Sequence, residues 1–187
     1  MPQFHDNAKL ILHEIDEALA AVSETEVEAL VDAVLGSEKV FVTGLGRVLL
    51  SLQAFVKRLN HLGVSAWYVG EMNEPALTER DLFIVGSGSG ETAVPLTITR
   101  IARRLGARIV HIGSNPRSSL SPLTDLFVRI PVRTKLDLPE EIPSRQIMSS
   151  LFEQCLLILG DAVALRIAER KSITDIKALW TLHANLE

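Results

Sequence analysis

The stretch that decides the fold is Leu82-Phe83-Ile84-Val85-Gly86-Ser87-Gly88-Ser89-Gly90-Glu91-Thr92. Its first four residues are apolar and have the composition of a buried strand, and the next five alternate glycine with serine. The following segment, Val94–Leu105, carries apolar residues at helical spacing. The order strand, glycine-rich loop and helix predicts one unit of a parallel α/β sheet, with the loop at the carboxyl end of the strand.

This loop predicts a site for an anion, and a phosphate group is the expected ligand. Glycine lets backbone N–H groups approach a ligand closely, and each hydroxyl adds a donor. The start of the following helix adds partial positive charge. The loop lacks the Gly-Lys-Ser/Thr ending of a P-loop, which argues against a nucleoside triphosphate. An ordinary Gly/Ser turn is the alternative interpretation.

Four further apolar runs have the same strand character, and helical segments separate most of the five. This alternation predicts an α/β protein, a three-layer sandwich in which a five-stranded parallel sheet is flanked by helices. The expected strands are Lys39–Thr43, Ser65–Val69, Leu82–Val85, Arg108–Ile112 and Leu126–Ile130, and the expected helices between them are Leu49–Leu62, Val94–Leu105 and a short turn at Ser118–Thr124.

The segments outside the sheet complete a single domain over residues 1–187. Two helices are expected within residues 3–36, the second with Ser23 as N-cap and Glu26 at the capping-box position. The α/β core spans 39–168, and a C-terminal helix, Ile173–Leu182, lies in a tail over 172–187. The mostly apolar segment 149–167 predicts a helix buried in the core or against another subunit. Residues 131–143 are irregular, and the sequence is compatible with a lid, an interface loop or a plain surface loop there.

Three polar, glycine-containing loops follow strands of this sheet and should meet at one edge, where such sheets bind ligands. They are Gly44–Gly46, Gly86–Gly90 and Gly113–Pro116. The first resembles the start of a dinucleotide fingerprint, but Leu49 occupies the position of the third glycine, which argues against NAD. Arg47 is interpreted as a cation beside the ligand or as a surface charge.

Candidate acid/base residues are a glutamate and two histidines. Glu153 lies on the apolar segment 149–167, where partial desolvation would make it a better proton acceptor near neutral pH; a solvent-facing helix-start acid is equally compatible. His61 ends a predicted helix, whose C-terminus would favour its charged form, and a simple helix cap is the alternative. His183, near the chain end, has the pattern of a surface residue. No metal-ligand spacing is present, so no metal is expected.

Composition excludes several classes of function. The chain has 187 residues, 47% of them hydrophobic, and a net charge of −4, so no basic field for nucleic acid exists. The single cysteine, Cys155, cannot form an internal disulfide, which favours a cytoplasmic location. Its side chain is expected to be a small buried one. No signal peptide is visible. The longest apolar stretch, within 155–167, is too short and too charged for a membrane span.

These motifs together resemble the sugar isomerase (SIS) family, and within it the 6-phospho-3-hexuloisomerase branch. The resemblance runs from the first strand to the last residue. The matching stretches are Val42–Arg47, Arg58–Gly63, Gly86–Thr92, Ser114–Pro116, Ser118–Leu120, Thr134–Asp137, Leu151–Gln154 and His183–Glu187.

The resemblance implies an enzyme that interconverts 3-hexulose 6-phosphate and fructose 6-phosphate through a cis-enediolate. It implies no cofactor, and a tetramer with sites at subunit interfaces. Ser87, Ser89 and Thr92 would hold the phosphate, and Glu153 would move the proton between C2 and C3. Arg47 would stabilise the oxyanion, and His61 or His183, from the same or a neighbouring subunit, would assist ring opening. Gly44, Gly46 and Asn115 complete the substrate-binding set that we expect.

Two departures from the family pattern border the expected pocket. Val48 and Leu49 stand where the family usually has Ser and Gly, which removes a hydroxyl and fills space near the ligand. Arg145–Ser149 replace a Gln-Pro-x-Gly stretch. An isomerase of a different phosphosugar, including one acting between C1 and C2, and a non-catalytic phosphosugar-binding or regulatory protein are the alternatives.

Overall fold

The protein is described here by a computed structural model covering residues 3–183. Its centre is a five-stranded sheet in which all strands are parallel, in the order β2-β1-β3-β4-β5. The strands are β1 (Val40–Thr43), β2 (Ala66–Tyr68), β3 (Leu82–Gly86), β4 (Arg108–Gly113) and β5 (Leu126–Arg129). The predicted parallel α/β sheet is confirmed.

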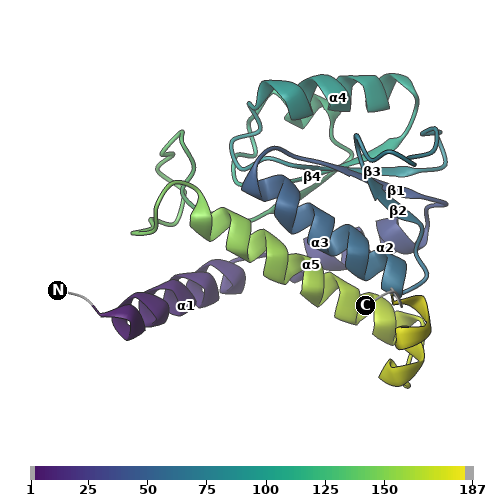
Figure 1. The fold of residues 1–187 in the computed structure, drawn as a ribbon. Helices are drawn as coiled ribbons and strands as arrows, with labels where there is room; N and C mark the ends of the chain where they lie inside the picture. The colour runs from purple at the N-terminus through teal and green to yellow at the C-terminus, as the bar shows by residue number, and fades with distance from the viewer. Residues whose placement is uncertain (1–2, 184–187) are drawn as a thin grey trace.

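Helices cover both faces of the sheet, which gives three layers (Figure 1). One face is covered by α4 (Ala93–Arg104), with the short 3-10 helix η1 (Ser121–Leu123) beside it. The other carries α2 (Glu24–Leu35), α3 (Arg47–His61) and α5 (Ser150–Arg170). Helix α1 (Phe4–Ala20) packs on α5 and projects away from the sheet (Figure 1).

Alternating strand side chains divide the apolar interior into two cores. Val42, Ile84 and Val110 face α2, α3 and α5 in the larger core, whereas Phe83 and Ile109 face α4 in the smaller one. Because both faces are covered, nearly every strand residue is apolar. Cys155 is fully buried in the larger core, and burial raises the pKa of its thiol to about 12.

Two local predictions need correction. Ser23 caps α2 as predicted, but the Glu26 carboxylate accepts a hydrogen bond from the Arg129 N–H at 2.8 Å and so ties α2 to β5. The helix predicted over Ile173–Leu182 is a shorter 3-10 helix, η2 (Ile176–Leu182). Ser172 has a φ of 54°, which turns the chain after α5, and the Asp175 side chain caps the new start.

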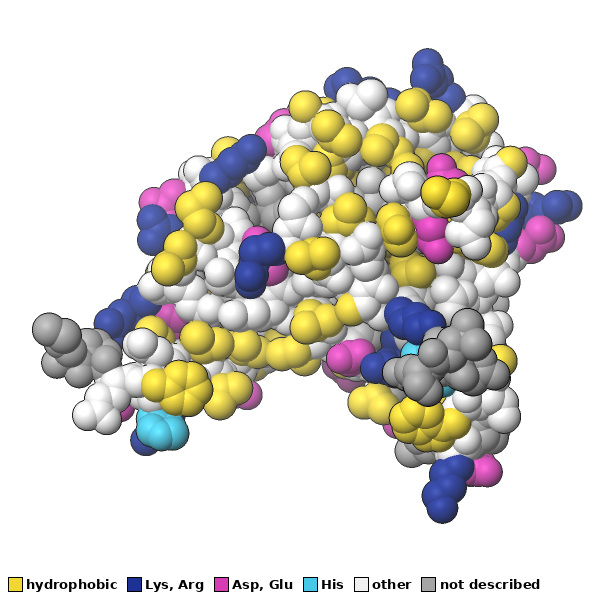
Figure 2. All heavy atoms as spheres, in the orientation of Figure 1, with side chains coloured by type: hydrophobic (Ala, Val, Ile, Leu, Met, Phe, Trp, Pro, Cys, Tyr) yellow, Lys and Arg dark blue, Asp and Glu magenta, His cyan; other side chains and the backbone are white. Residues whose placement is uncertain are grey.

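Hydrophobic side chains remain on the surface of α1 and α5 (Figure 2). Leu12 on α1 is 66% exposed and Leu165 on α5 is 68% exposed. An apolar groove between α1, α2 and α5 is lined in part by Leu19, Val22, Val27, Ile158, Ala162 and Leu165. None of the helices in the described part of the chain is long and apolar enough to cross a membrane.

His111 is the buried titratable group of the sheet. It lies in β4 with 1% of its surface exposed, and its Nε2 is 2.9 Å from the Ser87 carbonyl oxygen. Because that oxygen can only accept, Nε2 carries the proton and donates it. Burial lowers the pKa of His111 from 6.5 to about 4, although the bond to Ser87 opposes the shift. The neutral His111 ring therefore holds Ser87, the first residue after β3, through this hydrogen bond.

We predict that His111 makes the fold sensitive to mild acid. The unfolded chain takes up this proton near pH 6.5 and the folded chain only near pH 4. The unfolding free energy therefore falls with falling pH across this window, by about 1.4 kcal/mol per pH unit and about 3 kcal/mol in all. In His111→Gln the slope should be smaller by about one proton, measured by urea denaturation at a series of pH values.

His13→Gln is the control, because His13 is exposed on α1 and contributes no buried imidazole. It should keep the wild-type slope. An unchanged slope in His111→Gln would show that the buried ring does not control acid stability.

Candidate active site

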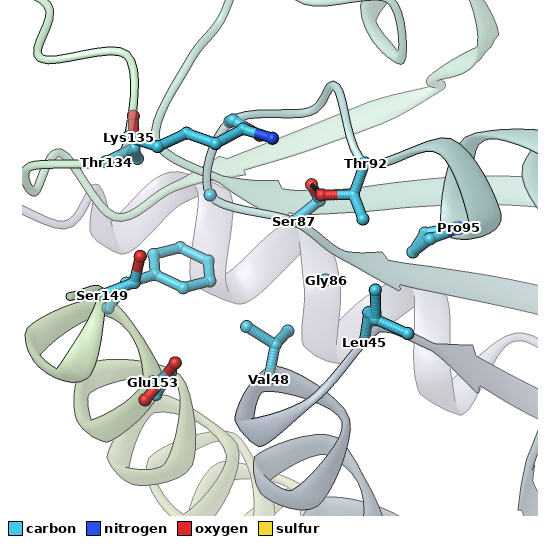
Figure 3. Close-up of a pocket in the computed structure, with 13 residues that line it drawn as sticks. Leu45, Val48, Gly86, Ser87, Thr92, Pro95, Thr134, Lys135, Ser149 and Glu153 are labelled. Carbon is cyan, nitrogen blue, oxygen red and sulfur yellow. Dashed lines mark hydrogen bonds between the residues drawn. The ribbon is translucent and has the colours of Figure 1, made fainter.

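A pocket of about 200 Å³ lies at the carboxyl ends of β1 and β3, where the sequence predicts the glycine loops to meet. Loop residues form one side, the first turns of α3 and α5 form another, and the 131–143 segment forms the rim (Figure 3). The lining residues are Leu45, Val48, Gly86, Ser87, Gly88, Ser89, Thr92, Pro95, Thr134, Lys135, Ser149, Phe152 and Glu153.

The serine loop (Ser87–Glu91) lines this pocket, and some of its backbone N–H groups have no acceptor among the described residues. The Gly90 N–H donates to Ser87 and the Glu91 N–H donates to the Ser89 hydroxyl. In contrast, the N–H groups of Gly88, Ser89 and Thr92 donate no hydrogen bond to any part of residues 3–183. Thr92 is also the N-cap of α4, whose first turn contains no acidic residue. Open donors at a helix start form a favourable anion site.

The loop after β4 holds the serine loop in shape. The Ser114 and Asn115 N–H groups donate to the Gly88 carbonyl at 2.9 and 3.1 Å. The Asn115 side-chain amide also donates to the Ser89 carbonyl at 3.3 Å. Asn115 is thus placed behind the serine loop and outside the pocket lining. Gly90 has a φ of 67°, and a Cβ there would lie 2.2 Å from the Ser118 hydroxyl.

Glu153 and Arg47 form the charged pair of the opposite wall. Glu153 lies in the first turn of α5, with its side chain 14% exposed, and its carboxylate pairs with the guanidinium of Arg47, the first residue of α3. The Ser51 hydroxyl donates to the Glu153 carbonyl oxygen at 2.8 Å, which joins the two helices at this point. Arg47 itself is 63% exposed and does not line the pocket.

Gly44 and Gly46 shape the turn between β1 and α3 without lining the pocket. Gly46 has a φ of 59° and is the N-cap of α3, a conformation that favours glycine. This turn brings Leu45 and Val48 to the pocket wall, where their side chains are apolar (Figure 3). Leu49 is not among the lining residues.

His61 and His183 lie together, but in another hollow. Their rings stack at 5.1 Å between centroids, beside Arg58, Leu179 and Trp180. Arg47 and His61 begin and end α3, so about 21 Å of helix separates the histidine from the glutamate's partner. Within one chain, the histidines and Glu153 therefore belong to different sites. Residues 184–187, the rest of the C-terminal motif, lie outside the described residues.

His61 is held neutral, contrary to the expectation from its place at a helix end. Burial lowers its pKa, and the charges of Lys57, Arg58 and His183 lower it further. Arg58 Nη1 lies 3.3 Å from Nδ1, whereas Nε2 is buried and meets no hydrogen-bond partner among residues 3–183. Burial, with the neighbouring cations adding to it, therefore outweighs the effect of the helix end on the pKa of His61.

The irregular 131–143 segment is a structured turn, and sequence reasoning did not place it in the site. The Glu141 carboxylate accepts hydrogen bonds from the Thr134 N–H and hydroxyl and from the Leu138 N–H, at 2.8 to 3.1 Å. Thr134 and Lys135 consequently line the pocket. The one signal in the sequence was the Thr134–Asp137 match to the family.

Helix α1 supports the adjoining segment through Glu14, which is 7% exposed. The Glu14 carboxylate accepts hydrogen bonds from the Ser144 hydroxyl, the Arg145 N–H and the Gln146 amide, at 2.7 to 3.1 Å. Burial opposes the charged form, but these bonds keep the pKa of Glu14 below its usual value. Arg145 and Gln146, the first two residues of the stretch that departs from the family pattern, are therefore held by a distant helix.

Known proteins are similar to this chain in sequence and in fold. A SIS domain model matches residues 34–159. A 3-hexulose-6-phosphate isomerase of Bacillus subtilis is 40% identical and covers 95% of each chain; one of Mycobacterium gastri is 36% identical over 97% of this chain and 90% of its own. A Methanococcus jannaschii structure, described as inferring 3-hexulose-6-phosphate isomerase function, has a TM-score of 0.81 at 27% identity, over 97% of this chain and 99% of its own. The chain belongs to the SIS domain family.

Proposed function

We propose that this protein is a 3-hexulose-6-phosphate isomerase, which interconverts 3-hexulose 6-phosphate and fructose 6-phosphate. The observation that carries the proposal is one pocket with open N–H donors on one wall and a glutamate on the other. Relatives at 36–40% identity over nearly the whole chain bear this name, which supports the choice of sugar.

The serine loop is the proposed phosphate site. The N–H groups of Gly88 and Ser89 and the hydroxyls of Ser87, Ser89 and Thr92 would donate to the phosphate oxygens, and the start of α4 adds its partial charge. The sugar chain would then extend from the loop toward α5.

Glu153 is the proposed base and acid. It would remove the proton from C2 of the 3-ketose and return it to C3, through a cis-enediolate. Arg47 holds the carboxylate in place through their ion pair and would stabilise the oxyanion that develops. Leu45, Val48 and Phe152 would shield the intermediate from water, so Val48 contributes a wall where a hydroxyl is expected.

Ring opening assigns a role to the histidines. A 3-ketose whose C6 oxygen is phosphorylated cannot close a furanose through that oxygen, so it is open-chain, whereas fructose 6-phosphate is cyclic. The neutral His61, with His183 beside it, is suited to move the hydroxyl proton. Since the pair lies far from Glu153 in its own chain, a neighbouring copy would supply it, and the exposed apolar face of α1 and α5 favours such assembly.

The proposed assembly is a homotetramer, as the resemblance implies. A cytoplasmic location, which the single cysteine favours, stays a prediction.

The first test is isotope exchange with fructose 6-phosphate in D2O, followed by NMR. We expect deuterium at C3, with 3-hexulose 6-phosphate appearing. In Glu153→Gln, which keeps the shape but removes the base, kcat should fall about 10³-fold while sugar binding changes by less than about threefold.

The matched control is Glu38→Gln. Glu38 is also paired with an arginine, Arg80, but it lies just before β1, at the opposite end of the strands from the pocket. Its kcat should match that of the wild type. Deuterium at C1 would instead identify an aldose–ketose isomerase. Binding without any exchange would identify a non-catalytic phosphosugar-binding protein.

A second test mixes two variants that each lack one proposed site residue, and measures turnover of fructose 6-phosphate. Glu153→Gln and His61→Gln chains, refolded together in equal amounts, should form hybrid oligomers. A site is native where the His61→Gln chain supplies the glutamate and the Glu153→Gln chain supplies the histidine. Random mixing makes about a quarter of the sites native, so about a quarter of wild-type activity should return. His61→Gln alone should lower kcat from fructose 6-phosphate more than kcat from the 3-ketose, because only the former needs ring opening.

Glu153→Gln refolded with Glu153→Ala controls for refolding, since no native site can form in that mixture. If the first mixture shows no more activity than its parents, the histidine does not come from a neighbouring copy.

A further inference from the structure

The charges around the pocket leave one cation without a carboxylate partner. The charged lining residues are Lys135 and Glu153, and Glu153 is already paired with Arg47. Lys135 forms no ion pair or hydrogen bond within residues 3–183. The pocket therefore has a neutralised end at Glu153 and a positive end at Lys135.

The 131–143 segment brings Lys135 directly to the serine loop. Thr134 is 8% exposed, and its Cγ2 lies 3.1 Å from the position that a Cβ on Gly88 would take. The Glu141 carboxylate fixes Thr134 through both its N–H and its hydroxyl. Figure 3 shows the Lys135 side chain extended from this anchor toward the loop that carries Ser87 and Thr92.

Glu91 is an acidic residue close enough to feel the charge of Lys135, but its carboxylate is bonded to another residue. Both oxygens of Glu91 are occupied by Ser119, at 2.8 Å from its N–H and 2.6 Å from its hydroxyl. These two bonds lower the pKa of Glu91, and the charge of Lys135 adds to the effect. The lysine is thus close enough to interact with Glu91 but is not captured by it.

A phosphate monoester carries nearly two negative charges at neutral pH. The serine loop offers neutral donors and the partial charge of a helix start, which together leave part of that charge uncompensated. A flexible ammonium on the rim is suited to supply the remainder, because it can follow the phosphate as the ligand enters.

We propose that Lys135 is the phosphate-binding cation of this pocket, and that it sets affinity for the phosphorylated end of the sugar without taking part in proton transfer. This inference rests on the proposed function for the identity of the sugar, and on the pocket alone for the phosphate.

The test compares Lys135→Met and Lys135→Arg with the wild type in two assays. One is turnover of fructose 6-phosphate, and the other is binding of inorganic phosphate by calorimetry. In Lys135→Met we expect KM to rise about tenfold or more with kcat within about threefold, and phosphate affinity to fall by a similar factor. Lys135→Arg should restore most of both, because it keeps the charge.

Arg100→Met is the control, because it removes one positive charge from the exposed surface of α4 without touching the pocket. It should leave both assays unchanged. A loss of kcat with unchanged KM in Lys135→Met would overturn the proposal, and so would unchanged phosphate affinity or a wild type that binds neither phosphate nor the sugar. Phosphate binding that depends on Lys135, without turnover by the wild type, would overturn the proposed reaction and leave the role of Lys135 standing.

Discussion

The pairing of β3 with β4 is the constraint on which the site depends. Their register aligns Gly86 with Ile112, so the two strands end together and their loops meet. The β4 loop then donates two N–H groups to the Gly88 carbonyl, while His111 donates to that of Ser87. With the Ser87 and Gly88 carbonyls satisfied from behind, the serine loop leaves the N–H groups of Gly88 and Ser89 without an acceptor among the described residues. A preformed anion site follows from strand pairing rather than from the loop sequence alone.

The pocket separates two electrostatic tasks. On one wall, backbone donors and Lys135 provide positive potential; on the other, the Arg47–Glu153 pair is nearly neutral as a unit. A base must keep its affinity for protons, and a phosphate held directly against Glu153 would perturb that affinity. Val48 and Phe152 add apolar surface to the same pocket, against which the carbon chain of the proposed sugar would pack.

Much of this was predictable from the sequence, for identifiable physical reasons. A strand buried on both faces is a continuous apolar run, so all five strands could be predicted from the sequence. The helices between them predicted that the strands are parallel and that the glycine loops lie at one end of the sheet. The serine loop and Glu153 follow from local patterns, and both line the pocket. The association of Glu141 with Thr134 could not be predicted. It consists of three hydrogen bonds to one carboxylate inside an irregular turn, and such a turn leaves no repeating pattern in the sequence. The separation of His61 from Glu153 could not be read either, since it depends on helix length and direction in three dimensions.

Glu14 has a consequence for how the protein can be altered. The first helix looks dispensable because it projects from the body (Figure 1), yet its one buried carboxylate anchors the chain that leads into α5. Trimming the N-terminus to obtain a smaller domain would release residues 144–146 and, with them, the chain that leads to the first turn of α5, where Glu153 lies. Helix α1 is therefore part of the working unit of this protein, although it lies outside the layers that cover the sheet.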